Sequence, residues 1–151
     1  AASSFTVQAA YFFLFMPIST FPARFEFLDE IRDFVAEVAR EGGFTEKAIY
    51  SLQLAADEAA SNIIEHAYQG VANASLQITC DMQDDELIIT MRDTGKPFEP
   101  SNVKQPNLKA DLSKRQIGGL WVYLMRKLMD EVRYESNAKT GNLLTMIKRR
   151  G

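Results

Sequence analysis

The sequence predicts an α+β fold, a two-layer α/β sandwich in which helices lie on one face of a mixed, largely antiparallel sheet. Two stretches with apolar residues at helical spacing come first, and they are followed by two alternating stretches separated by Asp84-Asp85. A long irregular segment, a further helical stretch and a second pair of alternating stretches complete the chain. This order gives antiparallel hairpins and leaves the helices to cover one side of the sheet.

The N-terminal half is expected to hold one strand and two helices. Residues 19–27 can form a short strand, and Pro22 favours a sheet edge because it has no N–H to donate. Apolar residues between 28 and 38 follow helical spacing, and Gly42-Gly43 stops that helix. Thr45 is a good N-cap for a second helix that ends near residues 68–70. The apolar inner face of this helix comprises Ile49, Leu52, Ala56, Ala59 or Ala60, and Ile63.

The C-terminal half is expected to hold two hairpins and one helix. Alternating residues 75–82 and 86–92 predict the first hairpin. Residues 93–116 carry three prolines and little periodicity, and a long segment of this kind inside a compact domain is usually a functional loop. Residues 120–129 predict a helix, and residues 132–134 and 143–148 predict two strands around a turn with Gly141-Asn142.

Bulk properties limit the classes of function. The chain has 151 residues, a net charge of -3 and a pI of about 5.2, which suits one globular domain and argues against nucleic-acid binding. A lone cysteine, Cys80, excludes a disulfide framework and a cysteine-based metal site, and it fits a cytoplasmic location.

Residues 1–19 are expected to be an N-terminal apolar extension, and residues 20–151 the functional domain. The apolar run at residues 9–16 is too short to span a bilayer, and no basic residue precedes it as in a secretory signal. It is interpreted as a buried strand or a strand that docks on a neighbouring chain. A membrane-proximal remnant and a non-native leader are the alternatives.

Three short motifs carry the candidate chemistry. Glu58 and Asn62 lie four residues apart on a predicted helix and therefore share one face of it. Asp93-x-Gly95 follows a predicted strand, and Gly118-Gly119 opens a helix, where free backbone N–H groups can bind phosphate. A carboxylate can accept a proton, and an amide oxygen can ligate a hard cation. Taken singly, these residues also suit a solvent-exposed helix face and ordinary turns.

Together and in this order, the motifs resemble the GHKL superfamily of ATP-binding domains, the histidine kinase-like ATPases with the Bergerat fold. Residues 93–100, 117–120 and 129–134 are most similar to the anti-sigma-factor serine/threonine kinases. The resemblance implies that Asp93 binds adenine, that Gly95, Gly118, Gly119 and Leu120 line the nucleotide site, and that Asn62 is the Mg²⁺ ligand. Glu58 is implied to be the general base. Lys114 or Arg115 is implied to reach the γ-phosphate, although either can be a solvated loop charge.

Other residues near the motifs are interpreted more simply. Trp121 stands where the resembling family commonly has a glycine, so the indole either crowds the phosphate loop or points into the core. His66, the single histidine, is assigned a supporting or structural role rather than that of a phosphoacceptor. Asp57 points about 100° away from Glu58 on a helix and is assigned no more than a supporting part.

The predicted function is that of an ATP- and Mg²⁺-dependent protein serine kinase and anti-sigma factor. The resemblance implies a sigma factor and an anti-anti-sigma (STAS-type) protein as partners, a homodimer, and no nucleic acid or membrane. Trp121 keeps a second hypothesis open, a non-catalytic nucleotide-sensing interaction module. The third hypothesis, the ATP-binding part of a sensor histidine kinase, ranks last because no phosphoacceptor helix precedes the domain in this sequence.

Overall fold

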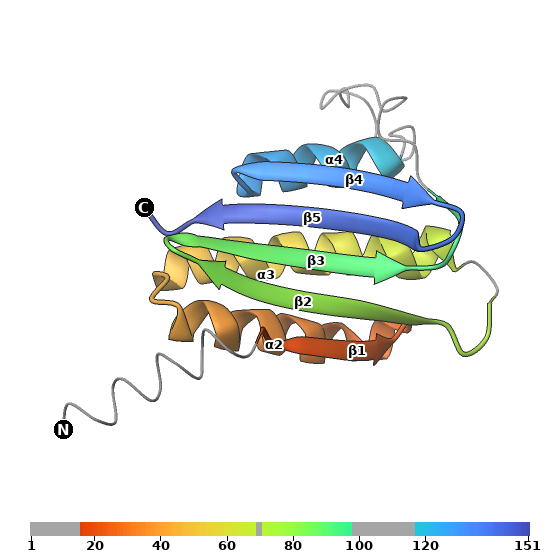
Figure 1. Cartoon of the computed structure of the whole chain (residues 1–151), viewed down its shortest axis with the longest axis horizontal. Coiled ribbons are helices and arrows are strands. Elements are labelled where there is room, and N and C mark those ends of the chain that lie inside the picture. The colour runs from red at the N-terminus through yellow and green to blue at the C-terminus, as the bar shows by residue number, and fades with distance from the viewer. Residues whose placement is uncertain (1–15, 69–70, 98–116) are drawn as a thin grey trace.

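A computed structural model describes residues 16–68, 71–97 and 117–151 of the chain, with the backbone alone for residues 117–121. Its five strands form one sheet in the order β1-β2-β3-β5-β4, and every pairing is antiparallel. The helices lie on one face of this sheet (Figure 1), so the predicted α+β class is confirmed. The elements in chain order are β1 (Ile18–Pro22), η1 (Phe25–Phe27), α2 (Leu28–Glu41), α3 (Glu46–Asn62), η2 (Ile63–Ala67), β2 (Ser75–Gln83), β3 (Glu86–Asp93), α4 (Ile117–Leu128), β4 (Glu131–Asn137) and β5 (Gly141–Arg149).

The first strand is shorter than predicted. β1 pairs with β2 at the sheet edge, as Pro22 indicated, but it ends at that proline. Ala23 N–H donates to Ala74 O at 2.9 Å, and the chain then turns into the 3-10 helix η1. Residues 25–27, which were expected to continue the strand, therefore form the entry to α2.

The second helix changes from α-helical to π-helical geometry directly after Asn62. Thr45 caps α3, and its Oγ1 accepts a hydrogen bond from Ala48 N–H at 3.2 Å. The α-helix ends at Asn62, and residues 63–67 continue it as the π-helical turn η2. Isolated π-turns are uncommon and often occur at functional sites.

The core lies between the sheet and the helices. Alternate residues of β2 and β3 face the helices and are fully buried, as are Ile31 and Val35 of α2. The inner face of α3 carries fully buried alanines, whose small side chains let this helix approach the sheet closely. The alanines are Ala55, Ala56, Ala59 and Ala60, which confirms the predicted inner face of α3.

The second hairpin turns earlier than predicted. The turn between β4 and β5 occupies residues 138–140, whereas Gly141 and Asn142 are the first two residues of β5. Gly141 has a φ of +87°, and a Cβ at this position would lie 2.4 Å from Asp93 O. Glycine is therefore required here for both conformation and space. The shift places Asn142 directly opposite Asp93 in the register of β3 and β5.

Candidate nucleotide site

The carboxylate predicted to bind a base is fixed at the end of β3. Asp93 is 5% exposed, and its Oδ1 accepts hydrogen bonds from Asn142 Nδ2 at 2.8 Å and from Gly95 N–H at 2.9 Å. Burial raises the pKa of Asp93, and these two hydrogen bonds partly oppose that rise because they favour the ionised form. Asp93 is thus a buried, oriented acceptor, which suits recognition of a donor group on a ligand.

The loop that follows Asp93 is anchored on the π-turn η2. Tyr68 Oη accepts a hydrogen bond from Thr94 N–H at 2.8 Å and donates one to Ser75 O at 2.7 Å. Lys96 N–H donates to Ala67 O at 2.8 Å. A Cβ on Gly95 would lie 2.3 Å from that same carbonyl oxygen, so only glycine fits between the two segments. These contacts join the Asp-x-Gly motif to the end of the helix that carries Glu58 and Asn62.

Glu58 is partly buried on α3 and has the properties of a proton acceptor. Burial raises the pKa of its carboxyl group, and the neighbouring charge of Asp57 raises it further. A carboxylate with a raised pKa is a stronger base than an ordinary one.

Asn62 carries an unsatisfied acceptor. Among the residues that the structure describes, its Oδ1 is the one fully buried side-chain nitrogen or oxygen without a hydrogen-bond partner. A buried acceptor without a partner needs an explanation, and an ion or a water molecule bound to it is one such explanation. An amide oxygen is a suitable ligand for Mg²⁺, which takes few protein oxygens and completes its shell with water and phosphate. The residue therefore fits the predicted metal role.

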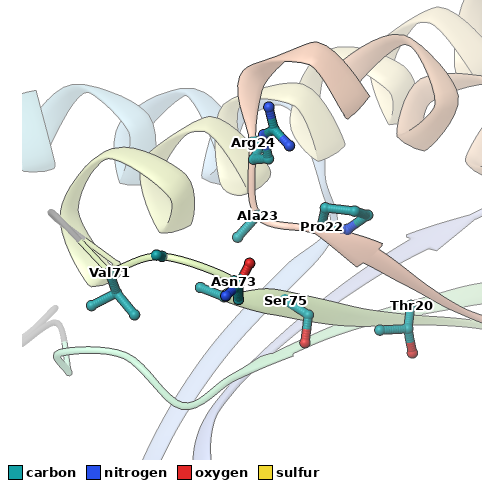
Figure 2. A pocket seen from close by; sticks show the side chains of 9 residues that line it. Thr20, Pro22, Ala23, Arg24, Val71, Asn73 and Ser75 are labelled. Carbon is teal, nitrogen blue, oxygen red and sulfur yellow. The ribbon is translucent and has the colours of Figure 1, made fainter.

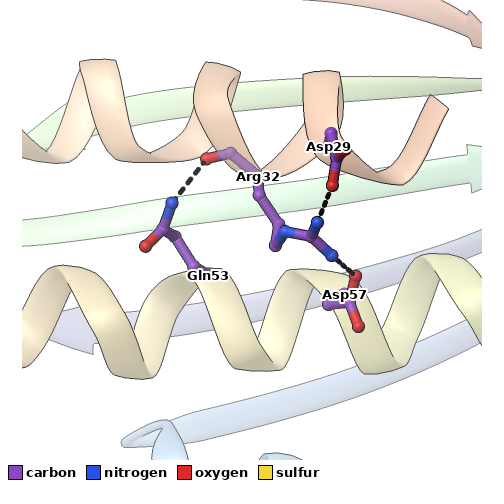
Figure 3. Close-up of polar contacts among 4 residues, drawn as sticks. All are labelled: Asp29, Arg32, Gln53 and Asp57. Atoms are coloured by element: carbon purple, nitrogen blue, oxygen red, sulfur yellow. Dashed lines mark hydrogen bonds and ion pairs between the residues drawn. The ribbon is translucent and has the colours of Figure 1, made fainter.

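Asp57 turns away from Glu58 and pairs with α2. The guanidinium of Arg32 forms ion pairs with both Asp57 and Asp29, and Gln53 Nε2 donates to Arg32 O at 3.4 Å (Figure 3). This network ties α2 to α3 beside the turn that holds Glu58. The predicted supporting part for Asp57 thus corresponds to an ion pair across the helices and an electrostatic effect on Glu58.

The remaining predicted residues lie at the start of α4 or outside the described residues. Gly118, Gly119 and Leu120 fall in the first turn of α4, as predicted, and this helix packs along α3. Lys114 and Arg115 lie outside the described residues, and the side chain of Trp121 does too. His66 is exposed on η2, with its Nε2 3.7 Å from Glu65 Oε2.

Sequence reasoning missed Asn142, Tyr68 and Arg32. Asn142 was assigned to a turn, Tyr68 to a helix end, and Arg32 to no role. All three act through contacts with residues at least 25 positions away, and no local pattern signals such contacts.

A separate cavity of about 720 Å³ lies where β1 ends and β2 begins (Figure 2). None of the candidate nucleotide-site residues lines it. Its lining consists of Thr20, Pro22, Ala23, Arg24, Val71, Ala72, Asn73, Ala74 and Ser75.

Comparisons with known proteins agree with this geometry. Residues 21–148 match the model of the histidine kinase-like ATPase domain. The serine-protein kinase RsbW of Bacillus subtilis is 33% identical over 122 residues, which cover 78% of this chain and 76% of that protein. The chain belongs to the histidine kinase-like ATPase family, with the RsbW serine-protein kinases among its relatives. RsbW of Listeria innocua is 29% identical over 74% of each chain.

Solved structures support the fold assignment. The catalytic domain of the histidine kinase ThkA, in a nucleotide-free form, aligns with a TM-score of 0.52 at 14% identity, covering 89% of this chain and 98% of that one. Family membership confirms the predicted resemblance, and the similarity to serine-protein kinases confirms the predicted enzyme class, a protein serine kinase with an ATP-binding domain. The similarity to the RsbW serine-protein kinases supports the main functional prediction as far as a protein serine kinase. No helix in the described part of the chain is long and apolar enough to cross a membrane.

Proposed function

We propose that this chain uses ATP with Mg²⁺ to phosphorylate a serine on an anti-anti-sigma protein of the STAS type, and that it binds a sigma factor in the cytoplasm. One observation carries the proposal. Glu58, with its raised pKa, and Asn62, with its orphan Oδ1, lie one turn apart on α3. The loop that bears Asp93 is anchored on the turn that continues this helix. A proton acceptor, a metal ligand and a carboxylate that binds the adenine base therefore lie in one connected part of the fold.

Each residue has a defined task in this proposal. Asp93 accepts a hydrogen bond from the adenine amino group, and Gly95 lets the loop that follows Asp93 pack against Ala67. Asn62 holds Mg²⁺, which when bound supplies positive charge to the phosphates. Glu58 takes the proton of the attacking serine hydroxyl.

The phosphates are assigned to the start of α4 and the segment before it. The backbone N–H groups of Gly118, Gly119 and Leu120 bind them at the helix N-terminus. Lys114 or Arg115 neutralises the γ-phosphate.

Transfer of labelled phosphate from ATP to a STAS-type protein tests the catalytic proposal. Wild type is expected to transfer phosphate and to bind ATP more tightly with Mg²⁺ than without it. Asn62→Ala is expected to abolish that Mg²⁺-dependent gain, whereas Ser51→Ala, on the same helix, leaves it unchanged. ATP binding by wild type with no transfer to any STAS-type protein would instead favour the nucleotide-sensing module, the function that Trp121 motivates.

We also propose that the chain forms a homodimer through the face of the sheet that the helices leave uncovered (Figure 1). The register brings Ile88 beside Ile147 and Thr90 between Thr79 and Thr145 on this face. Isoleucine and threonine side chains at the centre of an uncovered sheet face suit pairing with a second copy. Ile88→Lys is expected to give monomers in analytical ultracentrifugation, whereas Tyr50→Lys, an exposed substitution on α3, leaves the dimer intact. Dimers of the Ile88→Lys variant would exclude this interface.

A further inference from the structure

Asn142 is an unusual residue in this fold because it is polar and almost completely buried. It is 2% exposed, and within the described ranges only Asp93 is another polar or charged residue that is buried. The sheet register pairs Asn142 of β5 with Asp93 of β3 on one side and with Ser136 of β4 on the other. The three side chains therefore form a polar row across three neighbouring strands.

The hydrogen-bonding groups of the Asn142 side chain are committed within the protein. Its Nδ2 donates to Asp93 Oδ1 at 2.8 Å and to Gly95 O at 3.0 Å, which uses both amide hydrogens. Its Oδ1 accepts from Ser136 Oγ at 2.9 Å. Asn142 consequently has no donor left for a ligand, and any effect on a ligand must pass through Asp93.

Asp93 is held asymmetrically by these contacts. Oδ1 receives two hydrogen bonds, from Asn142 and from Gly95 N–H, while no described residue donates to Oδ2. The terminal torsion of an aspartate is broad when nothing fixes it. Two donors on one oxygen fix the plane of the carboxylate and leave the other oxygen to accept from a ligand.

We infer that Asn142 is a positioning and specificity-determining residue: it orients Asp93 so that Oδ2 accepts a hydrogen bond from the 6-amino group of a purine and disfavours a 6-oxo purine. The 6-oxo group is an acceptor, so it would face another acceptor and leave Oδ2 unpaired. This inference rests on the proposed function, because it requires Asp93 to face the nucleotide base.

Calorimetric titration with ATP and with ITP, both with Mg²⁺, tests the inference. Wild type is expected to bind ATP at least about tenfold more tightly than ITP. Asn142→Ala is expected to weaken ATP binding by about tenfold or more and ITP binding by less than about threefold, so that the preference collapses. Asn142→Leu, which keeps the side-chain volume, is expected to do the same and replaces the alanine variant if that variant does not fold.

Ser136→Ala serves as the matched control, since it keeps both donors to Asp93 Oδ1. Its preference for ATP is expected to stay within about threefold of wild type. The inference would be overturned if a folded Asn142 variant kept the wild-type preference for ATP over ITP. It would also be overturned if the variant lost affinity for ATP and ITP equally, and Asn142 would then have only a general structural role. Wild type that binds neither nucleotide would instead overturn the proposed function, and the inference with it.

Discussion

Replacing Gly95 by alanine tests whether the Asp-x-Gly loop is packed on the π-turn as the structure shows. The new Cβ would lie 2.3 Å from Ala67 O and 2.6 Å from Ala67 C, both backbone atoms. A carbon–oxygen contact normally needs about 3.3 Å, so the two segments must separate by about 1 Å. The hydrogen bond from Lys96 N–H to Ala67 O, now 2.8 Å long, would then stretch beyond its useful range.

The cost of this separation can be worked out from its parts. Overpacking of this kind costs about 1–3 kcal/mol, and the lost hydrogen bond costs about 0.5–1.5 kcal/mol more. For a chain of this size a total of about 1.5–4.5 kcal/mol lowers Tm by roughly 3–18 °C. Because Gly95 N–H also donates to Asp93 Oδ1, ATP affinity should fall about tenfold as well.

Thermal unfolding followed by circular dichroism measures the first effect, and calorimetry measures the second. Gly42→Ala is the matched control: its Cβ would lie 2.9 Å from Met82 Sδ, part of a flexible side chain, and 3.3 Å from the backbone atom Val38 O, and Gly42 has an ordinary φ of -74°. This control is expected to shift Tm by less than about 2 °C. A Gly95→Ala variant as stable as the control would refute the packing of the loop on η2.

Three further results are expected. Glu58→Gln should lower phosphate transfer to the STAS-type protein by about a hundredfold or more while ATP binding persists; transfer above a tenth of wild type would exclude Glu58 as the base. Burial and the charge of Asp57 raise the pKa of Glu58, and the base must be ionised, so activity should be lost as pH falls through that raised pKa. Asp57→Asn should move the acidic side of the pH–rate profile to lower pH, and Arg32→Ala should move it to higher pH. Profiles that coincide with that of wild type would contradict the electrostatic coupling between Asp57 and Glu58. Because the pKa of Asp93 is raised in the folded state, ionised Asp93 lowers stability at neutral pH; Asp93→Asn should therefore raise Tm in the absence of nucleotide, and a Tm below that of wild type would contradict this.

The sequence predicts what local periodicity and chain order determine. Helical spacing predicted α2 and α3, and Thr45 correctly marked the start of α3. The first hairpin turns at the predicted residues, and Asp84 there adopts a φ of 55°, a conformation that aspartate tolerates. These features depend on residues a few positions apart, and such residues are visible in the sequence.

Features that depend on register could not be predicted in the same way. Gly141-Asn142 is a typical turn dipeptide, yet the turn forms just before it because Gly141 is needed for the close approach to Asp93 O. The position of Asn142 opposite Asp93 follows from the pairing of strands 49 residues apart. Likewise, the change of α3 into a π-turn after Asn62 accompanies tertiary contacts of Ala67 and Tyr68 that no helical pattern records.

The candidate site concentrates features that lower stability in the absence of a ligand. Asn62 Oδ1 is buried without a partner, and the Asp93 carboxylate is buried at a cost that its two hydrogen bonds offset only in part. Both lie beside a π-turn, a less stable form of helix than the α-helix. A metal ion on Asn62 and a donor group on Asp93 would satisfy both groups at once. Ligand at a hundred times its Kd stabilises a folded protein by about 2.7 kcal/mol, which is comparable to the cost of one unsatisfied buried polar group. A bound state of this kind would give both Asn62 Oδ1 and the Asp93 carboxylate an additional partner, which would offset the cost of burying them.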